Sequence, residues 1–315
     1  MGFQEIVIER PVCARERPLS WYDVEGPLMT QSGTWPIRFS DGVPVLYKDY
    51  QRNHVILPGR ETALEEFLKS EYKGMQHKWK HRCNSNSEDA LTWSCFDLLS
   101  NLSLTQKISV LDEMFEDAYE GNSKILFNNY GLEKDQIEIY IGKQYIGLNS
   151  KEATEVDASI ELPGKLIFFE AKLYSTVSVA SPPEKPHDQI ARKLRIGLDS
   201  PLHDQREFFF IFLDIAPLKK LKMRKKKSEA LLPATSDFSD KWKSAWWFDY
   251  YKNGRNKSLR PLSEALEGID VPPVQSIADN MGWLTWSDVF KSILKGVITE
   301  SGCQTPVNSF TLKTE

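Results

Sequence analysis

Two carboxylates and a lysine lie close together in a stretch of sequence that is otherwise mostly apolar. Asp157 lies in an alternating segment over residues 155–160, while Glu170 and Lys172 interrupt a run that is apolar from Leu166 onward. Residues two apart on a strand point to the same side, with their Cα atoms about 6.5–7 Å apart. Desolvating a carboxylate and an ammonium costs several kcal/mol each. Two such charges on a buried strand therefore indicate that they have a chemical use.

The two segments form a predicted β-hairpin. Pro163 and Gly164 supply its turn, and the second strand has the composition of a central strand covered on both faces. The hairpin brings Asp157 beside Glu170, and neighbouring carboxylates repel unless a cation lies between them. Such oxygen ligands suit Mg²⁺ or Mn²⁺, and Lys172 could then orient or deprotonate an attacking water or stabilise a phosphate. The alternative is an ordinary salt-bridged hairpin on a half-exposed sheet.

Asp157 followed by Glu170-Ala171-Lys172 on the next strand resembles the PD-(D/E)XK nuclease superfamily, which has the restriction-endonuclease-like fold. The superfamily pattern is an Asp at the start of one strand and Glu-x-Lys on the next. This sequence departs from it at Val156, where the pattern has Pro. The resemblance implies a DNA phosphodiesterase that uses Mg²⁺, with Mn²⁺ as a substitute. Asp157, Glu170 and the Ala171 carbonyl would hold the metal, and Lys172 would position or activate the water.

A further acidic ligand is expected from a helix that precedes the hairpin. Glu88 lies three residues before Leu91 and extends an apolar stripe at helical spacing. That stripe consists of Leu91, Cys95, Leu98, Leu99 and Leu102. The first core helix of the superfamily often supplies a glutamate, so the resemblance makes Glu88 the candidate that completes the metal shell. The alternative, which stays open, is a capping box in which Glu88 bonds back to Ser85.

Candidate supporting and DNA-binding residues follow the hairpin. Residues 187–196 have the pattern of an amphipathic helix in which Gln189, Arg192 and Lys193 share one face. In the superfamily this helix lies beside the active site, so the resemblance gives Gln189 a supporting role in catalysis. Arg192 and Lys193 suit contacts with DNA phosphates. A solvated helix face is the alternative.

A strongly basic run follows the last apolar strand. Residues 219–227 hold seven basic side chains in nine positions, Lys225 and Lys226 among them. A local polycation of this density suits a clamp on the DNA backbone with salt-sensitive affinity. The alternative is a mobile charged loop.

The order of predicted elements gives the fold class. We expect an α/β core that runs helix, strand, strand, strand, helix, strand, with a mixed sheet in which a helical crossover joins two parallel strands. This order is the restriction-endonuclease-like core as the sequence presents it. The predicted segments are an irregular N-terminal accessory segment (1–84), the nuclease-like core (85–218), and a basic loop with an aromatic-rich helical extension (219–315) in which residues 277–297 are helical.

Composition bounds the class of protein. The chain has 315 residues, 41% of them hydrophobic, and a net charge of −4, so any positive DNA-binding surface must be local. Its four cysteines are scattered, which fits a reducing compartment. The sequence shows no secretory h-region and no apolar run of about 18 residues, which predicts a cytoplasmic protein without a membrane partner.

The sequence thus predicts a Mg²⁺-dependent DNA endonuclease, which we place in prokaryotic defence or a mobile element. A homodimer is plausible, because one site per chain favours two copies for cutting both strands. No P-loop motif is present, so any ATPase or targeting function would come from a partner subunit. The rival interpretations are a non-catalytic binding or scaffold protein of the same fold, and a nuclease subunit that is silent without its partner.

Overall fold

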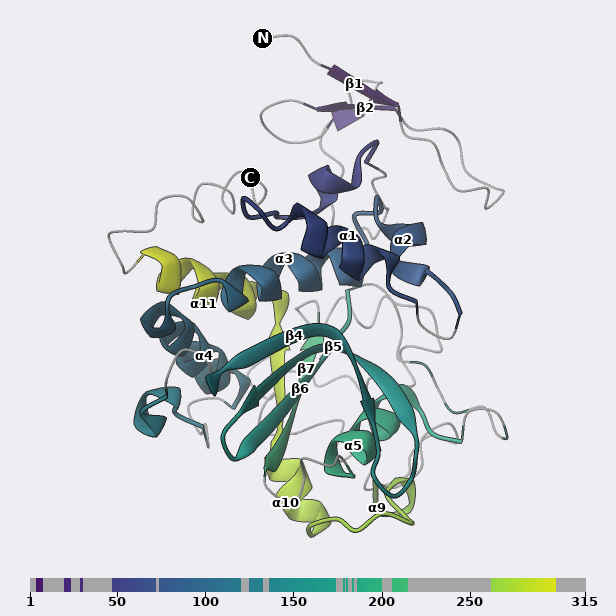
Figure 1. Cartoon of the computed structure of the whole chain (residues 1–315), viewed down its shortest axis with the longest axis vertical. Coiled ribbons are helices and arrows are strands. Elements are labelled where there is room, and N and C mark those ends of the chain that lie inside the picture. The colour runs from purple at the N-terminus through teal and green to yellow at the C-terminus, as the bar shows by residue number, and fades with distance from the viewer. Residues whose placement is uncertain are drawn as a thin grey trace, which may run out of the picture. The chain divides into compact units, whose positions relative to one another are not determined.

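The structure is a computed structural model (Figure 1), and the chain divides into two compact units. One unit comprises residues 1–98 with 301–315, and the other comprises residues 99–300. The structure describes residues 4–7, 20–23, 29–30, 47–71, 74–119, 125–132, 136–173, 178, 180, 183, 186–199, 206–214 and 262–298.

The first unit contains a small antiparallel sheet in the order β1-β2-β3, and helices. Their bounds are β1 Gln4–Val7, β2 Ser20–Asp23, β3 Met29–Thr30, the 3-10 turn η2 Tyr50–Asn53, α1 Glu61–Lys69, α2 His77–His81 and α3 Glu88–Ser100, the last of which ends in the second unit. Arg60 donates hydrogen bonds from two of its nitrogens to the buried carboxylate of Asp97, the shortest of them 2.7 Å long.

The second unit is built on a five-stranded sheet in the order β4-β5-β6-β7-β8. The strands are β4 Glu138–Ile146, β5 Ala153–Leu162, β6 Lys165–Ala171, β7 Glu207–Asp214 and β8 Met281–Thr285. β4, β5 and β6 are antiparallel neighbours, whereas β6–β7 and β7–β8 pair in parallel. The predicted α/β class, the mixed sheet and the parallel pairing that follows the Glu-x-Lys strand are therefore confirmed.

The predicted hairpin is present as β5 and β6. Leu162 pairs with Lys165 across the turn formed by Pro163 and Gly164, and Gly164 has φ of 75°, a value that glycine adopts without steric cost. Every residue of β6 is buried. The apolar composition of this strand is thus explained by cover on both faces.

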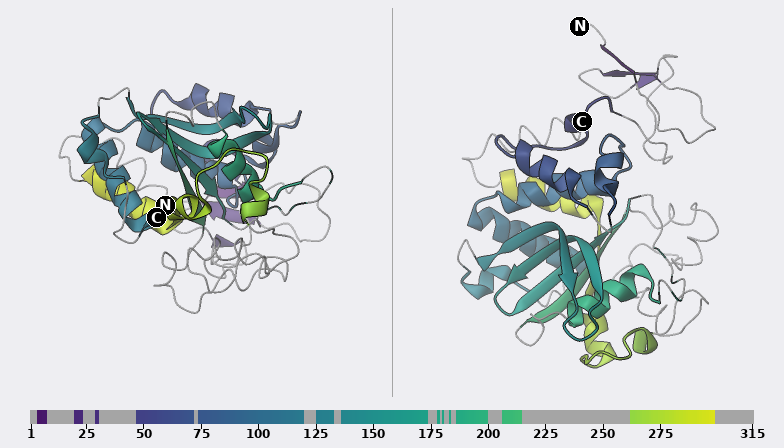
Figure 2. Two further views of the ribbon diagram at one scale, coloured as in Figure 1. Left: turned by 90° about the horizontal axis from the view of Figure 1, so that it is seen from below. Right: turned by 45° about the vertical axis from the view of Figure 1, so that its right-hand side comes forward.

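Helices cover the two faces of this sheet (Figure 2). Helix α5 (Gln189–Leu198) shares a buried apolar cluster with Phe208, Phe210 and Phe212 of β7. Helix α4 (Leu104–Ala118) lies on the other side, where Ala118 and Ile211 approach Gly282 of β8. Successive residues of a strand point to opposite faces, so β7 has to be apolar throughout. The remaining elements are η3 Phe127–Tyr130, α9 Leu262–Ala265, α10 Val274–Asp279 and α11 Trp286–Ile298.

The fifth strand corrects the helix predicted over residues 277–297. Residues 281–285 form β8, and helix α11 begins only at Trp286. All five residues of β8 are buried, and its Trp, Leu and Thr favour a pleated surface. The sheet therefore continues beyond residue 218, while the predicted division of the chain into three segments stays a prediction.

Serine side chains cap the starts of two helices. Ser103 is the N-cap of α4 and forms a capping box with Gln106. At the start of α3, the Ser87 hydroxyl accepts a hydrogen bond from the Ala90 N–H at 3.3 Å. Helix α3 therefore begins at Glu88 itself.

Candidate active site

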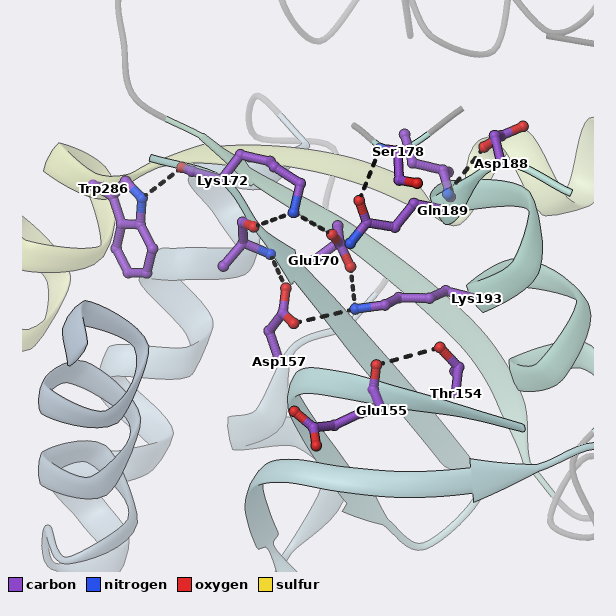
Figure 3. A network of polar contacts seen from close by, with 12 residues as sticks. Thr154, Glu155, Asp157, Glu170, Lys172, Ser178, Asp188, Gln189, Lys193 and Trp286 are labelled. Carbon is purple, nitrogen blue, oxygen red and sulfur yellow. Dashed lines mark hydrogen bonds and ion pairs between the residues drawn. The ribbon is translucent and has the colours of Figure 1, made fainter. Parts of the chain in front are cut away.

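Asp157, Glu170, Lys172 and Lys193 come together beside the carboxyl end of β6 (Figure 3). Ala158 pairs with Phe169, and the same register continued by one residue places Asp157 opposite Glu170. Lys172 follows the last residue of β6, and Lys193 comes from α5. The hairpin and the residue that follows it thus bring together Asp157, Glu170 and Lys172, three of the predicted catalytic residues, and the crossover helix adds a second lysine.

The contacts around Ala171 hold the predicted residues in place. The Asp157 carboxylate accepts a hydrogen bond of 2.7 Å from the Ala171 N–H. The Lys172 ammonium lies 2.6 Å from Glu170 Oε1 and donates to the Ala171 carbonyl at 2.8 Å. Asp157, Glu170 and the Ala171 carbonyl therefore each have a positive or donor group beside them.

Lys193 links the two carboxylates. Its ammonium lies 3.3 Å from Asp157 Oδ1 and forms an ion pair with Glu170 Oε2. The side chains of Lys193 and Glu170 are 2% and 0% exposed, whereas that of Asp157 is 27% exposed. The cluster is therefore buried on its Glu170 side, and Asp157 is the carboxylate that meets solvent.

The surroundings shift the pKa values of the two carboxylates in opposite directions. Burial alone would raise the pKa of Asp157, but Lys193, Lys172 and the Ala171 N–H together hold this pKa below its ordinary value. Burial and the charge of Asp157 raise the pKa of Glu170 in spite of the two lysines. Burial would lower the pKa of Lys193, yet the two carboxylates keep it above its ordinary value. Asp157 is thus the more firmly ionised of the two acids.

The donor set fits a hard divalent cation. It comprises two carboxylates and one backbone carbonyl, which are the oxygen ligands that Mg²⁺ accepts. The Lys193 ammonium lies between the carboxylates as a stand-in cation, and neither buried oxygen of Glu170 accepts a hydrogen bond of ordinary geometry from the described residues. No group of three or more Asp, Glu, His or Cys side chains suited to a metal occurs among the residues that the structure describes. Asp157, Glu170 and the Ala171 carbonyl thus leave positions in the shell of a metal for further ligands such as water or a phosphate.

Gln189 lies next to the cluster, as predicted from the position of its helix. Asp188 caps α5 by accepting hydrogen bonds of 3.0 Å from the Ile190 and Ala191 N–H groups. The Gln189 side-chain oxygen accepts from the Ser178 N–H at 3.1 Å, and its amide lies beside Glu170 in Figure 3. This geometry orients Gln189 towards the carboxylate and is compatible with a supporting role.

The predicted DNA-binding residues differ in their burial and contacts, and two of them lie outside the described residues. Lys193 is buried against the carboxylates, so a solvated helix face does not describe its position. The Nε atom of Arg192 is buried and has no hydrogen-bond partner in the described part of the chain. Lys225 and Lys226 lie outside the described residues. Glu88 belongs to the first unit at the start of α3, so its predicted part in the metal shell stays a prediction.

Two features of the site were missed from sequence. Lys193 was predicted to contact phosphate and not to pair with Asp157 and Glu170, although its spacing of one helical turn from Gln189 was a usable signal. Trp286, the first residue of α11, donates a hydrogen bond of 2.9 Å from its indole N–H to the Lys172 carbonyl. No pattern in the sequence connects these two residues, which are far apart along the chain.

In comparisons with known proteins, no family model, no curated protein and no solved structure matches this chain. Among the described residues, none of the helices combines the length and the apolar character needed to cross a membrane.

Proposed function

We propose that this protein is a metal-dependent phosphodiesterase acting on DNA, with a restriction-endonuclease-like core. The observation that carries the proposal is the convergence of Asp157 and Glu170 from adjacent strands, with Lys172 on the same side of β6. The chemistry of these groups suits hydrolysis of a phosphodiester, in which negative charge has to be stabilised and a water activated.

Asp157, Glu170 and the Ala171 carbonyl would hold Mg²⁺ or Mn²⁺. When bound, the metal would neutralise the scissile phosphate and the leaving oxygen. Lys172 is fixed between Glu170 and the Ala171 carbonyl, so its ammonium can orient the attacking water beside the ligands. Gln189 would support the geometry of Glu170. Glu88 would complete the shell if its helix presents it to the site.

Arg192, Lys193, Lys225 and Lys226 are the proposed contacts with the DNA backbone. Arg192 is partly exposed on α5, and its guanidinium suits a phosphate oxygen. We place the activity in the cytoplasm, in prokaryotic defence or a mobile element. A homodimer would supply two sites for two strands, and a partner subunit could supply targeting.

One observation favours a second candidate function. The two lysines balance the charges of Asp157 and Glu170 within the chain, as in a structural ion-pair cluster that needs no metal. A protein of this kind would be a non-catalytic DNA-binding or scaffold subunit, or a nuclease subunit that remains silent until a partner rearranges the site.

Cleavage of supercoiled plasmid with Mg²⁺ and with Mn²⁺ tests the proposal. Asp157→Asn and Lys172→Met should each abolish cleavage. Glu155→Gln is the matched control, because Glu155 lies on the same strand as Asp157 and its carboxylate points away from the cluster in Figure 3. Full activity in Asp157→Asn would refute the assigned site. Absence of both cleavage and Mn²⁺ binding in the unmodified protein would favour the scaffold function.

A further inference from the structure

Each ligand atom proposed on Asp157, Glu170 and Ala171 already has a partner within the chain. Asp157 Oδ2 accepts from the Ala171 N–H, and Asp157 Oδ1 faces Lys193. The two Glu170 oxygens face Lys172 and Lys193, one each, and the Ala171 carbonyl accepts from Lys172. A cation that is to reach both carboxylates therefore has to displace the one ammonium that contacts both of them, which is Lys193.

The charges of the cluster sum to zero, with two carboxylates against two ammonium groups. A divalent cation added to this arrangement would bring an excess of two positive charges into a largely buried site. Uncompensated buried charge costs several kcal/mol. The excess falls if Lys193 leaves the carboxylates, and it falls further if a phosphate anion comes with the metal.

Lys193 has the means to move. A lysine ammonium is a compact charge with three donors at the end of a flexible four-carbon stem. The path from the cluster to solvent lies on the side of Asp157, whose side chain is 27% exposed while that of Glu170 is fully buried. A DNA phosphate that approaches on this side would meet the displaced ammonium and the metal position together.

We propose that Lys193 is an internal counter-ion that a divalent cation replaces, and that the displaced ammonium then contacts a DNA phosphate. The inference rests on the proposed function of the site and adds how the binding of metal and the binding of DNA are coupled there. When the metal binds without DNA, the Lys193 ammonium has to move into water. When DNA is present, the same ammonium can move to a DNA phosphate instead. The two ligands therefore bind cooperatively, and each raises the affinity for the other by the same factor.

The test is the affinity of the DNA-free protein for Mn²⁺, measured by electron paramagnetic resonance of the free ion. Removing the competing ammonium in Lys193→Met should tighten Mn²⁺ binding about tenfold or more. Lys193→Gln, which keeps a polar group but no charge, should change it in the same direction and serves if the Met variant does not fold. Lys165→Met is the matched control, because Lys165, like Lys193, is a buried lysine in an ion pair, here with Glu207 at 2.7 Å. Lys165 is the first residue of β6, so it lies at the end of this strand away from the cluster.

The outcomes separate this inference from the proposed function. Tighter Mn²⁺ binding in both Lys193 variants, with Lys165→Met unchanged, is the expected result. Mn²⁺ binding by the unmodified protein that is equal or weaker in folded Lys193 variants would overturn the counter-ion role and leave the metal site intact. Failure of all the folded proteins to bind Mn²⁺ would overturn the metal site, and this inference with it.

Discussion

Replacing Glu170 with Gln should destabilise the second unit mainly by unbalancing charge. Gln has nearly the same shape as Glu but carries no charge, so the packing of the fully buried side chain is largely kept. Lys172 and Lys193 would then face a single carboxylate, Asp157. The substitution thus removes one negative charge from a neutral cluster and leaves an excess of positive charge in the protein interior.

The magnitude follows from the geometry. Glu170 is contacted by both ammonium groups, and the Lys172 contact is 2.6 Å long. Neither lysine side chain is more than 4% exposed, so water screens these charges weakly. Removing one partner of a buried pair typically costs about 3–5 kcal/mol. We expect a value near the lower end, because Asp157 remains beside Lys193 and is itself open to solvent.

A double-mutant cycle isolates the charge effect. In Glu170→Gln/Lys193→Met, one carboxylate and one ammonium remain and the cluster is again neutral. The loss of stability should therefore be smaller than the sum of the two single losses, by about 2 kcal/mol. Urea denaturation followed by circular dichroism measures each variant, and Lys165→Met replaces Lys193→Met in a control cycle. Additive losses in the Lys193 cycle would show that the ammonium does not respond to the charge of Glu170, and the reasoning would fail.

Three further outcomes are expected. Trp286→Phe removes the donor to the buried Lys172 carbonyl and should cost about 1–3 kcal/mol in urea denaturation, with a loss of cleavage greater than the loss of folded protein. The pKa of Asp157 is lower in the folded protein than its ordinary value of 3.8. The ionised carboxylate therefore stabilises the fold above pH 3.8, and this stability is lost as the pH falls through the folded pKa. Asp157→Asn should flatten the acid limb of a plot of unfolding free energy against pH, and an unchanged limb would contradict this. Gly197→Ala would place a Cβ 2.1 Å from the ring of Phe208 and should lower stability by about 1–3 kcal/mol, seen as a lower thermal midpoint.

Local signals explain the parts of the site that sequence predicted correctly. The strands that carry Asp157 and Glu170 are joined by a two-residue turn. Side chains alternate between the two faces of each strand, which fixes which of them face the same way. Once the hairpin was predicted, their proximity followed without any knowledge of the rest of the fold. The same logic placed Lys172 near Glu170, because residues two apart share a face of a strand.

Long-range packing explains the parts that sequence did not predict. Whether Lys193 faces solvent or the carboxylates depends on how α5 rotates against the sheet, and its periodicity allows more than one rotation. The strand at residues 281–285 was predicted as helix because a short segment with three apolar residues, Met281, Trp283 and Leu284, fits either period. Its pairing with β7 decides that the segment is a strand, because Phe210 pairs with Met281 and Asp214 pairs with Thr285. Trp286 then reaches Lys172 because β8 ends where β6 ends.

The balance of charge in the cluster is what separates an enzyme from a scaffold. A scaffold gains from keeping both lysines on both carboxylates, because any rearrangement exposes buried charge. An enzyme needs the carboxylates released when substrate arrives. The two lysines differ in how firmly their other contacts hold them. Lys172 donates to the Ala171 carbonyl and also pairs with Glu170, whereas among the described residues the Lys193 ammonium contacts only the two carboxylates. Under the proposed function, Lys193 would be the lysine whose departure frees the ligands, and Lys172 would stay to orient water.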